Sequence, residues 1–131
     1  MKSSILTQLR VCLMQRKATK NTRAANANEK AFHNWLSQQP CATCGNTPVI
    51  VHHCEGATFK HNKTLVGHWF CLPLCNNCDN VITHGSRKAF REKFGPQSYY
   101  WEGVITIYSL EVEDEKLPSQ EVYDAIVDWG R

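Results

Sequence analysis

The first clear pattern along the chain is a helical one. Residues 24–37 carry apolar side chains at spacings of three and four, which places them on one helix face, and Pro40 stands just beyond. This apolar stripe comprises Ala31, Phe32, Trp35 and Leu36. The preceding segment is polar and basic without clear periodicity, so we predict a basic, flexible N-terminal arm (residues 1–24) followed by one domain (residues 25–131).

The middle of the chain is predicted to form two strands and then helices. Residues 48–54 are rich in β-branched side chains, and residues 68–72 form a second apolar run beyond a polar loop. Residues 76–83 suit a short helix, and Ser86 can cap another over residues 87–94. The expected order of strand, strand and helix is an α+β arrangement.

The C-terminal part combines an ambiguous segment with a clear helix. Residues 103–110 are rich in β-branched side chains, and we predict a strand there, with a helix as the alternative. Ser119 can cap a last helix, which Gly130 ends. The inward-facing residues of this helix are Val122, Tyr123, Ile126, Val127 and Trp129.

Two cysteine pairs flank the predicted strands. Cys41 and Cys44 precede the first strand, and Cys75 and Cys78 follow the second, with two residues between the members of each pair. Two such pairs complete the four-sulfur tetrahedron of a structural Zn²⁺ ion. No apolar run reaches the length of a secretory signal or a membrane span, so we expect a cytoplasmic protein that uses these cysteines for metal rather than disulfides.

The net charge of +3 is unevenly distributed along the chain. Basic residues dominate the first 30 positions and recur after the second cysteine pair, whereas acidic residues dominate the C-terminal extension. The second basic group consists of Arg87, Lys88, Arg91 and Lys93. Basic side chains beside a metal centre suit contact with a phosphate backbone, although either cluster alone is equally consistent with a solvated helix face.

Four further residues have the chemistry of a metal-dependent hydrolytic site. His52 and His53 lie near the end of the first predicted strand, Asp79 follows Cys78, and His84 lies five residues later. A zinc ion that sets the two strands against the helix would allow these side chains to converge in one cleft. Two imidazoles and one carboxylate around a cation leave open positions for water and a phosphate oxygen, which catalysis requires.

From about Phe32 to Phe94 the chain resembles the HNH, or ββα-metal, nucleases, and within them the phage Ref-like nucleases named after recombination enhancement. The resemblance rests on the turn from Cys41 to Gly45, the pair His52-His53, the run from Leu72 to Asp79, and His84-Gly85 followed by Arg87 and Phe90. The chain departs from the usual pattern at Asp79, where such families usually have histidine.

This resemblance implies a small ββα-metal core, clamped by the four-cysteine zinc site and flanked by helices. It implies a metal-dependent DNA endonuclease with His53 as general base and with His52, Asp79 and His84 as ligands of a catalytic Mg²⁺ or another divalent metal. It also implies a bacterial host cell, a role in phage recombination, and single-stranded or displaced-loop DNA and a RecA filament as partners.

Other interpretations stay open at this point. The main rival is a non-catalytic, zinc-ribbon-like DNA-binding protein whose histidines only support the fold, and another is an interaction module that uses the acidic extension. His61 or His68 could replace His84 as a ligand. Aromatic residues at 99–101 either stack on bases or pack in a loop. Three cysteines are interpreted as buried or incidental thiols, namely Cys12, Cys54 and Cys71.

Overall fold

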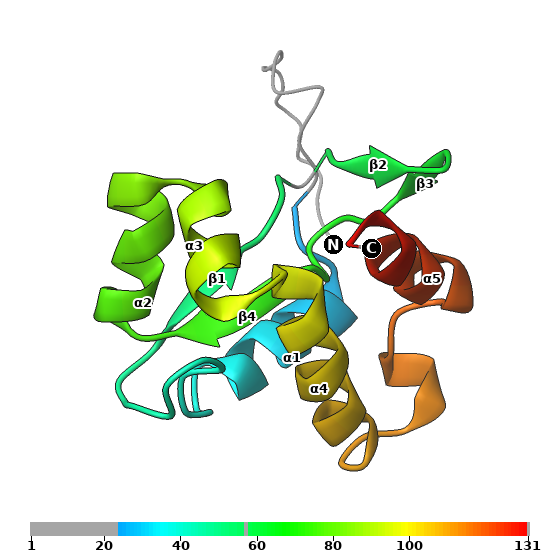
Figure 1. Ribbon diagram of the computed structural model, residues 1–131. Coiled ribbons are helices and arrows are strands. Elements are labelled where there is room, and N and C mark those ends of the chain that lie inside the picture. The colour runs from blue at the N-terminus through cyan, green and yellow to red at the C-terminus, as the bar shows by residue number, and fades with distance from the viewer. Residues whose placement is uncertain (1–23, 57, 131) are drawn as a thin grey trace, which may run out of the picture.

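The computed structural model describes residues 24–56 and 58–130, so all but the last residue of the predicted N-terminal arm lies outside the described residues (Figure 1). The described chain is α+β, as expected, with helices around two small two-stranded sheets. No helix in this part of the chain is long and apolar enough to cross a membrane.

The first helix, α1 (Ala27–Leu36), begins at a reciprocal cap. The side chain of Asn26 accepts a hydrogen bond from the N–H of Glu29, and the Glu29 carboxylate accepts one from the N–H of Asn26, both at 2.9 Å. Glu29 is fully buried, and its second oxygen accepts from the N–H of His68 at 2.9 Å. The start of α1 is thereby tied to the segment that leads into the central hairpin.

The central hairpin pairs β1 (Ile50–His53) with β4 (Cys71–Leu74) in antiparallel register. β1 lies within the predicted strand over residues 48–54, β4 overlaps only the end of the predicted strand over residues 68–72, and α2 (Asn76–Asn80) follows β4 almost at once. His53 lies opposite Cys71, so these two side chains project from the same face of the ribbon. His52 projects from the other face.

The short helix after β4 does not continue as a regular α-helix. It passes into a π-helical turn, η1 (Val81–Gly85), in which the N–H of Ser86 donates to the carbonyl of Val81 at 3.0 Å. Ser86 then caps α3 (Arg87–Phe94) by accepting from the N–H of Ala89, as its sequence position predicts. Gly95 ends α3 with a φ of 96°, a conformation that favours glycine.

The predicted strand over residues 103–110 is wrong, because this segment lies in α4 (Gln97–Ser109). Trp101, Ile105 and Tyr108 are spaced by four and three residues and are all buried. Burial of that helical face outweighs the strand preference of the β-branched side chains. Trp101 is fully buried and its indole N–H donates to the carbonyl of Trp69 at 2.8 Å, whereas Tyr99 is 69% exposed.

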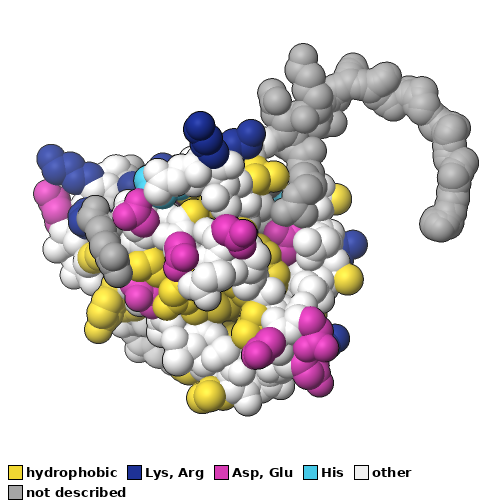
Figure 2. All heavy atoms as spheres, turned by 90° about the vertical axis from the view of Figure 1, so that its right-hand side faces the viewer, with side chains coloured by type: hydrophobic (Ala, Val, Ile, Leu, Met, Phe, Trp, Pro, Cys, Tyr) yellow, Lys and Arg dark blue, Asp and Glu magenta, His cyan; other side chains and the backbone are white. Residues whose placement is uncertain are grey.

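The remaining elements flank this centre. α1 and α4 pack against β4, while α5 (Gln120–Trp129) packs against α4 and against a small hairpin of β2 (Lys60–His61) and β3 (Thr64–Leu65) (Figure 1). This hairpin lies in the predicted polar loop. The face of the molecule that carries α5 shows scattered acidic side chains, and its basic side chains lie towards the edges (Figure 2).

Removing the indole N–H of Trp101 tests the link between α4 and the approach to β4. Trp101→Phe leaves the Trp69 carbonyl without its donor and a gap beside the smaller ring, so the free energy of unfolding should fall by about 2–3 kcal/mol. Denaturant unfolding measures this loss, and Tyr99→Phe at an exposed position should change stability by less than about 0.5 kcal/mol. Equal stability of both variants would contradict this account of the core.

Candidate functional site

The four paired cysteines converge into one cluster. The sulfur atoms of Cys41, Cys44, Cys75 and Cys78 lie within 4.8 Å of one another, with Cys44 and Cys75 3.5 Å apart. Neighbouring sulfurs around a tetrahedral zinc ion lie about 3.8 Å apart, given Zn–S bonds of about 2.3 Å. The cluster can therefore hold a structural metal ion such as Zn²⁺.

Backbone geometry presents both cysteine pairs to this cluster. Gly45 adopts a φ of 81°, and its N–H donates to the carbonyl of Cys41 at 2.9 Å, which closes a tight turn around the first pair. The N–H of Ala42 donates to the carbonyl of Pro73 at 2.8 Å, so this turn is joined to β4. The second pair lies at the start of α2, where Cys75 is the N-cap residue.

The pKa values of Cys41 and Cys78 are shifted in opposite directions. Burial favours the neutral thiol of Cys41, but hydrogen bonds from the Thr43 hydroxyl and nearby backbone groups outweigh it and lower the pKa to about 6. Burial, reinforced by the neighbouring cysteines, raises the pKa of Cys78 to about 12. A bound cation would displace the remaining thiol protons, as metal binding to cysteine requires.

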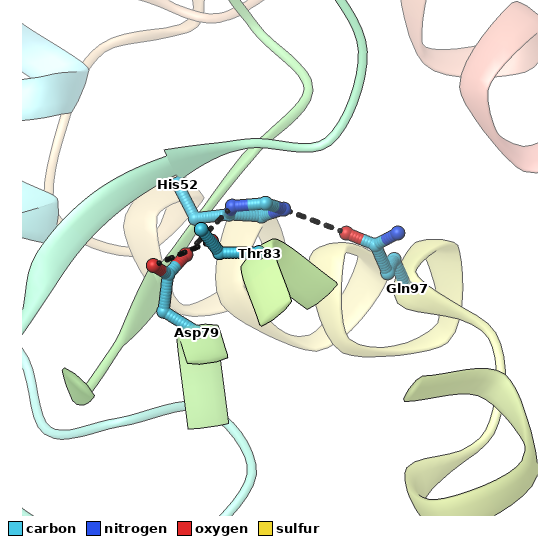
Figure 3. A network of polar contacts seen from close by, with 4 residues as sticks. All are labelled: His52, Asp79, Thr83 and Gln97. Carbon is cyan, nitrogen blue, oxygen red and sulfur yellow. Dashed lines mark hydrogen bonds and ion pairs between the residues drawn. The ribbon is translucent and has the colours of Figure 1, made fainter. Parts of the chain in front are cut away.

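His52 and Asp79 meet on one face of the central hairpin. Nδ1 of His52 lies 3.0 Å from a carboxylate oxygen of Asp79, and Nε2 lies 3.1 Å from the side-chain oxygen of Gln97 at the start of α4 (Figure 3). The hydroxyl of Thr83 donates to the second oxygen of Asp79 at 3.1 Å. His52 and Asp79 are 13% and 15% exposed, so this polar network is accessible but largely shielded.

His53 lies on the opposite face, among other histidines. Its ring centroid is 5.3 Å from that of His33 on α1 and 5.6 Å from that of His68. Its Nε2 is 3.4 Å from Nδ1 of His68, and its ligand atom lies within 4.8 Å of those of His33 and Cys71. The structure therefore brings His52 to Asp79 but places the two adjacent histidines in separate environments.

The surroundings of His53 lower its pKa below the ordinary value for histidine. The main cause is partial desolvation of the ring, followed by electrostatic repulsion from the protonated forms of His33, His68 and His52. The residue itself remains exposed, so the neighbouring rings enclose only part of its side chain. A neutral imidazole, which can accept a proton or a cation, is favoured at this position.

The other proposed site residues lie on η1 and α3. His84 is exposed on η1, and among the described residues it belongs to no set of three metal-binding side chains whose ligand atoms lie within 4.8 Å. Arg87 pairs with Glu55 at 2.7 Å. The basic residues Lys88, Arg91 and Lys93 are exposed along α3.

Several residues at these centres were not predicted from the sequence. The hydroxyl of Thr83 follows Asp79 by four residues, a helical spacing that could have been recognised. His33 and Gln97 reach the hairpin from distant elements, and nothing in their local sequence indicates this. Cys71, predicted to be a buried or incidental thiol, is fully buried and lies directly opposite His53 on the neighbouring strand.

Loss of one ligand tests the four-cysteine cluster. Cys78→Ser should lower the tightly bound zinc by one equivalent per chain and lower the melting temperature, because metal affinity at such a site contributes to folding. Elemental analysis and thermal unfolding measure the two effects. Cys54→Ala, at a buried cysteine outside the cluster, should keep that zinc. Unchanged zinc in Cys78→Ser would show that the cluster is not the binding site.

Comparison with known proteins gives one family and no characterised relative. A family model described as "Protein of unknown function (DUF968)" matches residues 14–112, which is more than half of the 131-residue chain. No curated protein and no solved structure shows significant similarity to the chain. The matched region contains both cysteine pairs, His52 and Asp79. The protein therefore belongs to the DUF968 family.

Proposed function

We propose that the protein is a metal-dependent DNA endonuclease of the HNH type, related to the phage recombination-associated (Ref-like) nucleases and acting in the cytoplasm of a bacterial host. The contact of 3.0 Å between His52 on β1 and Asp79 on α2 carries this proposal. It joins an imidazole and a carboxylate across an antiparallel hairpin and the helix that follows it, beside a cysteine cluster suited to structural zinc. These features support a ββα-metal interpretation.

The donor atoms around His52 suit a hard divalent cation. Asp79 supplies a carboxylate oxygen, the type of ligand that Mg²⁺ prefers, and Nδ1 of His52 faces it at 3.0 Å. In this proposal His52, Asp79 and His84 hold the catalytic metal. A bound divalent cation would supply neutralising charge for a phosphate group during hydrolysis.

The chain itself would supply the proton acceptor and the means of positioning. His53 ends β1 and is exposed on the opposite face from His52, so its role as base requires a DNA strand that crosses this end of the hairpin and contacts both faces. We assign His53 as the general base, which accepts a proton from water as the water attacks phosphorus. Thr83 and Gln97 hold the carboxylate of Asp79 and the ring of His52 in place.

Metal-dependent cutting tests the proposed enzyme. Supercoiled and single-stranded DNA are incubated with the protein and Mg²⁺ or a chelator, with and without a RecA filament. Cutting should require the metal, and His53→Ala and Asp79→Asn should each slow it by about 10²-fold or more. His61→Ala is the matched control, because His61 lies on β2, outside the central hairpin, and pairs with Asp128 on α5; this variant should cut at the normal rate.

Two results would contradict the nuclease assignment. Metal-independent DNA binding without cutting, in any condition of the assay, would favour the alternative of a non-catalytic, zinc-ribbon-like DNA-binding protein. Equal cutting by wild type and both site variants would place the activity elsewhere, either in a contaminant or at other residues.

The basic residues of α3 give a separate prediction about DNA binding. The triple variant Lys88→Ala, Arg91→Ala, Lys93→Ala removes exposed cations that can contact phosphates, so affinity should fall for every DNA sequence alike. The slope of log affinity against log salt should decrease by up to about 3. Fluorescence anisotropy at several salt concentrations measures both, and Lys116→Ala on the acidic extension is the control. An unchanged slope would exclude α3 from the DNA interface.

A further inference from the structure

The face of the central hairpin opposite Asp79 gathers nitrogen and sulfur ligands from separate elements. His33 comes from α1, His53 from β1 and Cys71 from β4, and one ligand atom of each lies within 4.8 Å of the others. His68, just before β4, adds a third imidazole beside His53. These residues are distinct from the four-cysteine cluster and from the network around His52.

We propose that His33, His53 and Cys71 form a second metal site, selective for a borderline-soft divalent cation such as Zn²⁺, with His68 placed to supply a fourth ligand. Imidazole and thiolate are the ligands that zinc prefers, and Mg²⁺ avoids them. Inhibition of DNA cutting by a metal at this site rests on the proposed nuclease function, but the metal site itself does not.

Two distances between these side chains are close to those expected around a tetrahedral ion. Bonds of about 2.0 Å to nitrogen and 2.3 Å to sulfur place two nitrogens about 3.3 Å apart, and a nitrogen and a sulfur about 3.5 Å apart. Nε2 of His53 lies 3.4 Å from Nδ1 of His68, and the sulfur of Cys71 lies 3.5 Å from Nε2 of His33. Small side-chain rotations would therefore bring these atoms to a common centre.

The surrounding structure holds the cluster in place. The antiparallel register sets Cys71 beside His53, and the fully buried carboxylate of Glu29 accepts from the N–H of His68 at 2.9 Å. The Glu29 carboxylate therefore fixes the backbone of His68 beside the cluster. The site is thus built on a hairpin and a capped helix.

In the absence of metal, hydrogen bonds satisfy part of the cluster. The His68 carbonyl lies 2.7 Å from Nε2 of His33 and accepts from the thiol of Cys71 at 3.2 Å. Burial, with a smaller contribution from Glu29, raises the pKa of Cys71, so the metal must displace a thiol proton and free a histidine nitrogen. We therefore expect weaker binding here than at the four-cysteine cluster.

Metal at this site would regulate the proposed nuclease. A cation bound to the imidazole of His53 occupies the nitrogen lone pair that a general base needs to accept a proton from water. Zinc in excess of the structural ion should therefore inhibit DNA cutting in the presence of Mg²⁺. Mg²⁺ should not do so, because it competes poorly for nitrogen and sulfur ligands.

Cobalt binding tests the site directly and independently of activity. Protein whose four-cysteine cluster is filled with Zn²⁺ is titrated with Co²⁺, and a sulfur-to-cobalt absorption band should grow and saturate at one added equivalent per chain. His33→Ala and Cys71→Ser should each weaken Co²⁺ binding by about 10-fold or more. Cys54→Ser is the matched control, since Cys54 is buried, adjacent to His53 and outside the cluster, and it should retain the band.

Circular dichroism of each variant separates loss of the metal site from loss of the fold. If Cys71→Ser fails to fold because Cys71 is buried, His33→Ala still tests the site, since His33 is partly exposed. Absence of the band, or an equal band in wild type and His33→Ala, would overturn the proposal. The failure of the nuclease function would show differently, as a normal band in a protein that cuts no DNA. If cutting occurs, its inhibition by Zn²⁺ should be lost in His33→Ala.

Discussion

The register between β1 and β4 is the constraint on which the chemistry of this molecule depends. Because His53 lies opposite Cys71, the antiparallel pairing places the side chain of His53 on the face that α1 covers. The side chain of His52 then lies on the other face, where α2 and α4 begin. A slip of one residue would exchange these faces and separate His52 from Asp79. A metal ion in the sulfur cluster would stabilise this register, because it would join the turn before β1 to the start of α2. The same turn is linked to β4 by the backbone bond from Ala42 to Pro73.

Much of this arrangement follows from local sequence signals. The spacing of the cysteines predicts the four-sulfur cluster, and apolar periodicity with Ser119 predicts α5. Residues 103–110 were misassigned because β-branched side chains favour strands, whereas the decisive quantity is burial of Trp101, Ile105 and Tyr108 against the rest of the fold. That burial depends on packing against distant elements, so a short stretch of sequence does not predict it.

The candidate site shows the same division between local and long-range information. Two adjacent histidines on a strand predict opposite faces, but nothing near them in the sequence says that Gln97 will meet one or that His33 will approach the other. The π-helical turn of η1 was not predicted either, and it sets the direction of His84 relative to Asp79. Contacts between distant elements are therefore the part of the site that the sequence does not predict.

The two faces of the hairpin differ in the hardness of their ligands, which explains how neighbouring histidines could serve different cations. Around His52 the partners are oxygen atoms of Asp79 and Gln97, which suit Mg²⁺. Around His53 the partners are nitrogen and sulfur, which suit Zn²⁺. Since the strand itself separates the two sets, a cation can select its face by ligand type alone. In a nuclease that uses His53 as base, such selection would let the level of Mg²⁺ set activation at one face while the level of Zn²⁺ sets inhibition at the other.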